Sequence, residues 1–187
     1  MITIVSGLPR SGTSLMMQML AAGGMPVVSD GERKADTDNP RGYYEWERIK
    51  LLPQQPNLIA EAEGKAVKAI SQLLFPLPPG YEYRVIFMER PLAEVVASQA
   101  EMIRRRGTTG AAPPPTALIA GLTAHLHQVN AWLKDKGNIS ILRTAYHDVL
   151  SDPLRIAESI QSFLGRTLDV QAMARQVDQS LYRQRSV

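Results

Sequence analysis

The sequence predicts an α/β fold in which helices cover both faces of a central, mostly parallel sheet. Short apolar runs alternate along the chain with longer segments of helical periodicity, as they do when each strand is followed by a helix. The run at 85–88, Val-Ile-Phe-Met, is continuously apolar, which is typical of a strand covered on both faces. A glycine-containing loop joins the first apolar run, at 2–6, to a helix predicted over 11–22. We therefore expect a three-layer sandwich.

The other elements follow in order along the chain. After a helix stop at Gly23, the polar stretch 29–42 is rich in turn formers and predicts a loop. Further strands are expected at 65–70, 84–90 and 139–144, and further helices at 43–52, at 92–106, at 116–135 and after Ser151-Asp152-Pro153, ending at Gly165. No internal repeat or linker divides the chain, so we expect one domain over 1–187.

Composition narrows the class of protein. Hydrophobic residues make up 44% of the 187 residues, which is enough for a packed core. No apolar run approaches the ~20 residues that span a bilayer, and the N-terminus lacks the basic region of a secretory signal. The chain has no cysteine, which excludes disulfides, thiolate metal sites and cysteine nucleophiles. We expect a cytoplasmic protein with no membrane partner.

The charge balance favours a small anionic ligand. The 21 basic and 18 acidic residues give a net charge of +3, which is too small to argue for nucleic acid as a partner. The run Arg104-Arg105-Arg106 is expected to end a helix, where solvated cations complement the helix dipole. A contact with an anionic ligand at the rim of a site is the alternative for this run.

The loop after the first strand has the glycine spacing of a P-loop, G-x-x-x-x-G-K-[ST]. Gly7, Gly12 and Ser14 occupy the expected positions, but Thr13 stands where the lysine belongs, and the cation comes earlier, at Arg10. A helix that starts here offers unpaired N–H groups and a positive dipole end. The loop is therefore predicted to bind one compact oxyanion within a P-loop NTPase-like fold.

Two segments then resemble the sulfotransferases that use 3′-phosphoadenosine 5′-phosphosulfate (PAPS). "PRSGTS", at 9–14, resembles their 5′-phosphosulfate loop, in which Lys or Arg precedes Ser-Gly-Thr-[Ser/Thr]. "ERPLAEVVASQ", at 89–99, resembles their 3′-phosphate segment, with Arg90 ending a strand and Ser98 eight positions later. Here Pro91 follows the arginine directly, whereas the family usually places its proline one residue further on.

Two longer stretches extend the resemblance over most of the chain. "NPRGYYE", at 39–45, is similar to the Asn-Pro-Lys-Gly-Tyr-Phe-Glu stretch of bacterial sulfotransferase-like proteins. Residues 144–165 are similar to a later region of those proteins, with His147 in place of a glutamate. The Arg-Lys-Gly segment that completes the 3′-phosphate site in cytosolic members is absent from the sequence, and Arg183 and Arg185 are the candidates to replace it.

The resemblance implies a donor site for PAPS and transfer of a sulfuryl group to a hydroxyl or an amine, without a metal. It implies that Arg10 stabilises charge on the bridging oxygen and that Arg90 and Ser98 hold the 3′-phosphate. The backbone N–H groups of four loop residues, with two of their hydroxyls, would hold the 5′-phosphate: Ser11, Gly12, Thr13 and Ser14. Tyr146 is the candidate contact for adenine, with a core or rim tyrosine as the alternative.

The resemblance also suggests two further catalytic residues. Glu45 is the preferred base that takes the acceptor's proton, with a surface glutamate beside Arg48 and Lys50 as the alternative. Lys68 is expected to point at the transferred sulfate. Lys65 competes for that role, and either lysine could instead lie exposed at the strand edge.

The histidines are weaker candidates for the base. His125 falls on the apolar face of the helix at 116–135 and is expected to be a packed structural histidine, while His127 is expected to face solvent. His147 follows a strand, near the sheet edge where ligands bind in such folds, and is a minor alternative.

Two rival functions stay open. A P-loop kinase using ATP and Mg²⁺ could use Ser14 as a magnesium ligand, with Glu89 ending a strand as the acidic partner. A nucleotide-binding module that has lost catalysis is the other rival. The acceptor, a small molecule or a glycan, is not readable from the sequence, and a homo-oligomer is left open. The segments 28–64 and 104–116 are the expected lids over the acceptor pocket.

Overall fold

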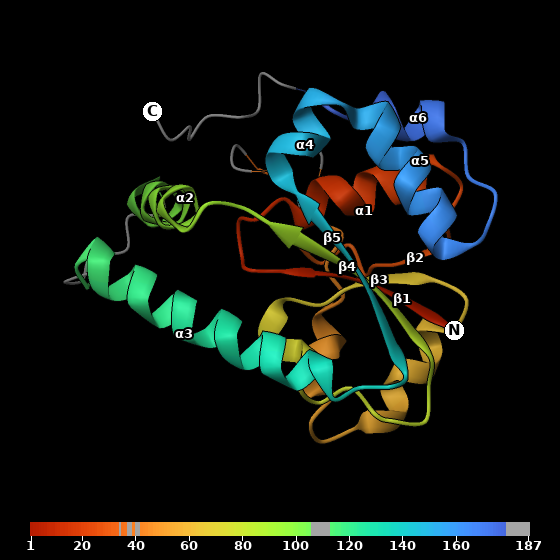
Figure 1. The fold of residues 1–187 in the computed structure, drawn as a ribbon, viewed down its shortest axis with the longest axis horizontal. Coiled ribbons are helices and arrows are strands. Elements are labelled where there is room, and N and C mark those ends of the chain that lie inside the picture. The colour runs from red at the N-terminus through yellow and green to blue at the C-terminus, as the bar shows by residue number, and fades with distance from the viewer. Residues whose placement is uncertain (34, 37–38, 40–41, 106–112, 179–187) are drawn as a thin grey trace.

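The computed structural model describes residues 1–33, 35–36, 39, 42–105 and 113–178, and it contains a five-stranded sheet (Figure 1). The strands are β1 (Ile2–Gly7), β2 (Val27–Val28), β3 (Ala66–Lys68), β4 (Tyr83–Glu89) and β5 (Ile139–Ala145). They lie in the order β2-β3-β1-β4-β5, and each of the four pairings is parallel. The predicted parallel α/β sheet is therefore confirmed, with the short β2 as an addition that the sequence did not indicate.

Helical segments cover both faces of this sheet. Above it in Figure 1 lie α1 (Thr13–Ala22), α4 (Tyr146–Ser151), α5 (Pro153–Leu164) and α6 (Val170–Ala174). Below it lie α3 (Pro115–Lys134) and three 3₁₀ segments, η1 (Glu47–Leu51), η2 (Pro56–Ala62) and η3 (Ser71–Leu74), while α2 (Leu92–Arg105) packs beside α3. This is the three-layer sandwich that the sequence predicted.

The central strand explains why the fold has two cores. Successive side chains of a strand point to opposite faces, so Ile2 and Ile4 of β1 enter the core beneath the sheet and Val5 enters the core above it. All three are 0% exposed, and burying each contributes about 1.5–3 kcal/mol. Because the sheet is covered on both faces, its central strand carries buried apolar side chains on both sides.

Local chemistry sets where the helices begin and end. The α1 helix begins at Thr13, two residues after the predicted start, because Gly12 precedes it in a left-handed conformation with φ 102°. In α5, the Asp152 side chain accepts a hydrogen bond from the Arg155 N–H at 3.2 Å, and Gly165 ends the helix with φ 62°.

The structure differs from the sequence predictions for several of the shorter elements. The helix predicted over 43–52 is wrong at its start, because Tyr44 has φ 52°, and only the 3₁₀ segment η1 follows. The predicted strand at 65–70 is confirmed as the shorter β3. The short helices α4 and α6 were not predicted. In the described part of the chain, none of the helices has the length and apolar character needed to cross a bilayer.

The topology places three loops at one edge of the sheet. The chain runs from β1 to β2 and β3 on one side of β1, and then crosses to β4 on the other side. Ligands of open α/β sheets bind where the strand order reverses in this way, at the carboxyl ends of the strands. The segments that follow β1, β3 and β4 meet at that place.

Candidate functional site

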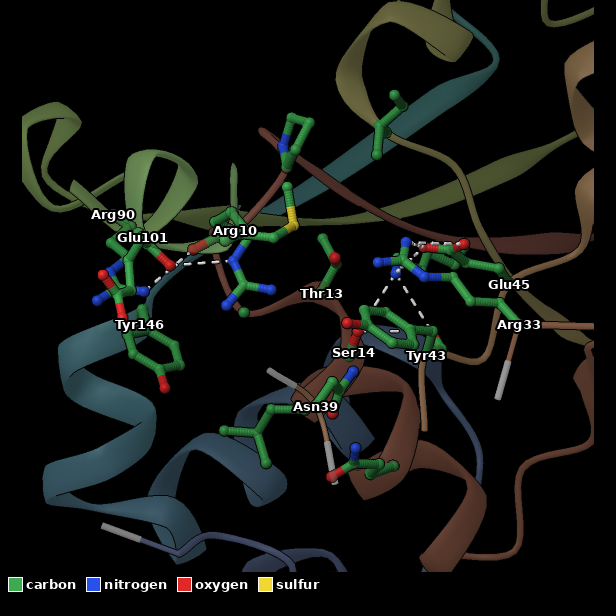
Figure 2. A pocket seen from close by; sticks show the side chains of 18 of the residues that line it. Arg10, Thr13, Ser14, Arg33, Asn39, Tyr43, Glu45, Arg90, Glu101 and Tyr146 are labelled. Atoms are coloured by element: carbon green, nitrogen blue, oxygen red, sulfur yellow. Dashed lines mark hydrogen bonds and ion pairs between the residues drawn. The ribbon is translucent and has the colours of Figure 1, made fainter. Parts of the chain in front are cut away.

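A cavity of about 260 Å³ lies at this edge of the sheet. Figure 2 shows its two ends: Arg10, Arg90 and Tyr146 gather at one, Arg33, Tyr43 and Glu45 at the other, and Thr13 and Ser14 lie between them. Lys68, Ser98 and Gly12 also line the cavity, so all of the predicted site residues except Ser11 are among its lining residues.

The loop between β1 and α1 requires its glycines. A Cβ on Gly7 would lie 2.5 Å from the Ser11 Oγ and 2.6 Å from the Met88 carbonyl oxygen. A Cβ on Gly12 would lie 2.4 Å from a ring carbon of Tyr146. Arg10 between them has φ 74°, which is unusual for a residue with a side chain. The loop therefore turns tightly and brings its backbone against the neighbouring strand and ring.

The start of α1 is open to an anion. Among the described residues, Gly12 gives the helix no side-chain cap and the first turn holds no acidic residue. The unpaired N–H groups and the dipole of the first turn therefore face the cavity without a competing negative group. Ser11 departs from the prediction, because its N–H donates to the Leu8 carbonyl at 3.1 Å. Its Oγ is buried and has no hydrogen-bond partner in the described structure.

We call one end of the cavity the arginine end; it is lined by Arg10, Arg90, Ser98 and Tyr146, and Glu94 lies behind Arg90. The Arg10 Nε donates to the Ser98 Oγ at 2.9 Å, and the Arg90 Nη1 donates to the Arg10 carbonyl at 3.1 Å. The Arg90 Nε donates to Glu94 at 2.9 Å, and these two side chains are 8% and 4% exposed. The two arginines that the sequence assigned to different phosphates are therefore direct neighbours.

Tyr146 forms the floor between the loop and Arg90. The Arg90 Cζ lies 4.8 Å from the centroid of the Tyr146 ring, and the same ring closes against Gly12. Burial raises the pKa of the Tyr146 hydroxyl, and the charges of Arg90 and Arg10 only partly oppose this. The phenol therefore stays protonated at neutral pH, and its ring supports the guanidinium.

We call the other end the carboxylate end, formed by Ser14, Arg33, Tyr43, Glu45 and Lys68. The Lys68 Nζ donates to the Ser14 Oγ at 3.2 Å, to the Tyr43 carbonyl at 3.1 Å and to the Glu45 Oε1 at 3.1 Å. The Lys68 side chain is 8% exposed. Of the two competing lysines, Lys68 thus lies in the site.

A second cation binds the same carboxylate. The Arg33 Nη1 donates to both oxygens of Glu45, at 2.9 and 3.2 Å, and the Arg33 Cζ lies 3.4 Å from the centroid of the Tyr43 ring. Burial acts to raise the pKa of Glu45, but the bonded charges of Lys68 and then Arg33 outweigh it, so the pKa lies below its usual value. Glu45 is therefore a carboxylate at neutral pH.

The remaining candidates lie elsewhere. His125 contacts the Ser71 Oγ at 2.8 Å and packs edge-on against Phe75, and burial lowers its pKa, so the structural interpretation of His125 is supported. His127, His147 and Lys65 are exposed and are not among the described residues that line the cavity. Arg104 and Arg105 end α2 and both pair with Glu101, as predicted for a solvated helix end, while Arg105 also reaches the rim of the cavity. Arg106, Arg183 and Arg185 lie outside the described residues.

Three residues of the site were not singled out from the sequence. Arg33 lies in a polar stretch with no periodicity, so its pattern carried no signal. Tyr43 lies in the stretch 39–45 that carries the family resemblance, and that resemblance was the signal that could have found it. Glu94 had a readable signal, because it stands four positions after Arg90 and such spacing brings an acid and a base together at a helix start.

Several solved structures of sulfotransferases share this fold. The chain is similar to the sulfotransferase domain of the Synechococcus PCC 7002 olefin synthase, with 15% identity, a TM-score of 0.58 and coverage of 97% of this chain and 78% of that one. Sulfotransferase STF1 from Mycobacterium tuberculosis H37Rv gives 19% identity, a TM-score of 0.59 and coverage of 97% and 73%. Mouse sulfotransferase SULT7A1, complexed with PAP, gives 16% identity, a TM-score of 0.52 and coverage of 94% and 62%.

These likenesses establish the fold, at identities too low to carry an activity across. They confirm the resemblance to sulfotransferases at the level of fold. No protein-family model matches the chain, and no curated protein matches its sequence.

Proposed function

We propose that the chain is a sulfotransferase that moves a sulfuryl group from PAPS to a hydroxyl or an amine of a small-molecule or glycan acceptor. The observation that carries this proposal is the arrangement of charge in one cavity: the uncapped start of α1 after the glycine loop lies beside a second cationic cluster, formed by Arg10 and Arg90. A nucleotide with phosphates at both its 5′ and 3′ positions fits two separate anion sites, whereas ATP carries its phosphates in a single chain. The shared fold with a mouse sulfotransferase complexed with PAP supports the same donor.

The residues present suit the donor. The first turn of α1, with the hydroxyls of Thr13 and Ser14, would hold the 5′-phosphosulfate, as helix N-termini hold anions elsewhere. Arg90 and Ser98 would hold the 3′-phosphate. Because Arg10 bonds Ser98 and belongs to the loop itself, its guanidinium is within the same cluster as both groups. PAPS supplies the activated sulfuryl group, and the chain supplies cations where negative charge develops.

The reaction assigns one role to each end of the cavity. The bond from sulfur to the bridging oxygen breaks, and a bond from sulfur to the acceptor's oxygen or nitrogen forms. Adenosine 3′,5′-bisphosphate leaves with the electron pair, and the acceptor's proton passes to Glu45. Arg10 and Lys68 stabilise the charge that appears during transfer more than the charge of the ground state, which lowers the barrier. The sulfuryl group carries less charge than a phosphoryl group, so we propose that transfer needs no Mg²⁺.

The geometry gives less support to the alternative function, a P-loop kinase that uses ATP and Mg²⁺. Glu89, the acid that would organise Mg²⁺ in that reading, is exposed, bonds Arg143 at 2.7 Å and is not among the described residues of the cavity lining. Thr13 leaves the lysine position of the loop without a charge. The positive charge near the loop comes instead from Lys68 of β3, whose Nζ donates to the Ser14 Oγ.

The test is a calorimetric titration with three nucleotides: adenosine 3′,5′-bisphosphate, 5′-AMP, and ATP with Mg²⁺. We expect the bisphosphate to bind about 30- to 150-fold more tightly than 5′-AMP, because a 3′-phosphate in a charge-assisted site contributes about 2–3 kcal/mol. Arg90→Ala should remove most of that preference. The matched control is Arg104→Ala, which removes an exposed arginine of α2 outside the cavity lining. Equal affinity for adenosine 3′,5′-bisphosphate and 5′-AMP, or tighter binding of ATP with Mg²⁺, would contradict the proposal.

Turnover is tested separately with PAPS and a panel of hydroxyl and amine acceptors, in buffer with EDTA and in buffer with Mg²⁺. Equal transfer in both buffers is expected. Nucleotide binding without transfer to any acceptor would favour the rival module that binds and does not catalyse.

A further inference from the structure

The carboxylate end contains a contact that the proposed chemistry does not require. Lys68 joins Glu45 to the loop through its bonds to the Glu45 Oε1 and the Ser14 Oγ. Arg33 also bonds both oxygens of the same carboxylate, at 2.9 and 3.2 Å. The Arg33 side chain is 32% exposed, so it reaches Glu45 from the partly open side of the cavity rather than from the core.

The backbone around Glu45 holds this contact in register. The Ser29 hydroxyl and the Asp30 N–H both donate to the Glu45 carbonyl, each at 3.1 Å, and the Glu47 N–H donates to the Asp30 side chain. These bonds tie the segment that carries Arg33 to the segment that carries Glu45. The approach of Arg33 to the carboxylate is therefore set by the fold of the loop and not by a chance surface pairing.

The Tyr43 ring fixes the guanidinium itself. The Arg33 Cζ lies 3.4 Å from the ring centroid, in stacking contact, and the Tyr43 hydroxyl donates to the Asp36 carboxylate at 2.7 Å. A stacked guanidinium keeps its fork in one plane, which suits a contact with both oxygens of a carboxylate. Because Asp36 holds the Tyr43 hydroxyl, the Tyr43 ring is a rigid support for Arg33.

We propose that Arg33 is a positioning residue for Glu45: it orients the carboxylate that receives the acceptor's proton and sets how readily that carboxylate accepts it. This inference rests on the proposed function and adds to it a residue that controls the base. A base clamped by two cations is weak, because protonation would leave both cations without their counter-charge. Release of Arg33 makes Glu45 a stronger base and a less well-oriented one.

The surroundings of Glu45 determine the sign of the effect. The cations that face its carboxylate are Lys68 from β3 and Arg33 from the loop, and Arg10 acts on Lys68 at longer range. The nearby acid Asp36 is engaged by the Tyr43 hydroxyl. Removing the Arg33 charge takes away a group that favours the carboxylate, so the pKa of Glu45 must rise.

The experiment measures the titration of Glu45 directly. In protein carrying ¹³C-labelled glutamate, the Glu45 δ-carbon signal is identified by its loss in Glu45→Gln. We expect Arg33→Gln to raise the pKa of Glu45 by about one unit, the size typical of a lost ion pair. Arg33→Met keeps an unbranched stem on the Tyr43 ring and should give the same rise. Arg33→Lys keeps a charge and should give a smaller one.

A matched variant controls for general loss of positive charge. Arg48→Gln removes another arginine of the same region, which pairs with Glu61 and lies near the Trp46 ring, and it should leave the titration of Glu45 unchanged. The acid limb of the pH profile of kcat/KM should move upward with Arg33→Gln by the same amount as the carboxyl signal. A Glu45 titration in Arg33→Gln and Arg33→Met that coincides with that of the unmodified chain would overturn the inference.

The two proposals fail separately. Should the protein not bind adenosine 3′,5′-bisphosphate, the proposed function fails, while the carbon titration still decides whether Arg33 controls Glu45. Should the nucleotide bind and the Glu45 titration not respond to Arg33, the inference alone fails. Far-UV circular dichroism of each variant verifies that the fold is retained.

Discussion

The arginine end and the carboxylate end of the cavity treat their cations differently. At the arginine end, Arg10 bonds a neutral hydroxyl, and Arg90 bonds a backbone carbonyl as well as Glu94. At the carboxylate end, Lys68 and Arg33 converge on the single carboxylate of Glu45. Glu94 is 4% exposed and is not among the described lining residues, whereas Glu45 lines the cavity.

Because of this difference, one cavity can both hold an anion and accept a proton. At the arginine end, Glu94 lies behind Arg90, and Glu101, which lines the cavity there, is already paired with Arg104 and Arg105 (Figure 2). That end therefore presents the positive charge of Arg10 and Arg90 and is suited to holding an anion. An end whose carboxylate faces the cavity is suited to receiving a proton.

Glu45→Gln changes the carboxylate end, Arg90→Ala and Ser98→Ala change the arginine end, and Gly12→Ala changes the loop where the two ends meet. These variants therefore test whether the two ends act independently.

The largest expected effect is on catalysis at the carboxylate end. Glu45→Gln should lower kcat by about 10²–10⁴-fold, the usual contribution of a general base, while the affinity for adenosine 3′,5′-bisphosphate changes little. Initial rates with PAPS and calorimetry measure the two quantities. Glu47→Gln is the control, since Glu47 pairs with exposed Lys50 outside the cavity lining. Unaltered turnover in Glu45→Gln would remove the distinction between the two ends.

The next effect is on stability at the arginine end. Arg90→Ala should lower the free energy of unfolding by about 3–5 kcal/mol, because it leaves the Glu94 carboxylate buried without this partner. Adding Glu94→Gln should restore a large part of the loss. Urea unfolding of the two variants measures this recovery. If the double variant is as unstable as the single one, Arg90 stabilises the fold through other contacts.

A smaller effect is expected where the two ends meet, at Gly12. Gly12→Ala should cost about 1–3 kcal/mol of stability through its positive φ, with a further loss of nucleotide affinity because its Cβ would meet the Tyr146 ring. Gly24→Ala is the matched control, since Gly24 also has a positive φ, of 88°, but nothing within 4 Å of its Cβ position. Thermal unfolding separates the backbone cost, which both share, from the collision, which only Gly12→Ala has.

The smallest effect belongs to a single neutral partner. Ser98→Ala should weaken binding of adenosine 3′,5′-bisphosphate by about 0.5–1.5 kcal/mol, the contribution of one hydrogen bond, and leave 5′-AMP binding unchanged. Titration of both nucleotides tests this. A loss as large as that of Arg90→Ala would mean that Ser98 acts mainly by holding Arg10 in place.

Sequence patterns predicted the framework of the site better than its contacts. The order of strands and helices and the glycine loop followed from short-range spacing, which is fixed by backbone geometry, while Arg90 and Ser98 followed from the family resemblance. The bond between Arg10 and Ser98 joins residues 88 positions apart, and no local pattern encodes such a contact. The sequence also assigned the Ser11 N–H to the anion, whereas the turn uses it for the Leu8 carbonyl.

Arg33 shows most clearly which contacts the sequence could not predict. Its segment is polar and has no period, so it predicts only a loop. The stacking on Tyr43 and the shared carboxylate of Glu45 depend on how two parts of that loop fold onto each other. Helix periodicity can reveal a core face, but the meeting of two irregular segments has no comparable signature.

The edges of the sheet bear on how the chain behaves at high concentration. A long unpaired edge strand can recruit a second copy and start aggregation. At one edge, β2 has only two residues, which is too short to template another strand. At the other, the exposed Arg143 of β5 bonds Glu89 and Asn130. A charge in the middle of an edge strand makes edge-to-edge pairing costly. Both edges of the sheet therefore disfavour pairing with a second copy and the growth of fibres.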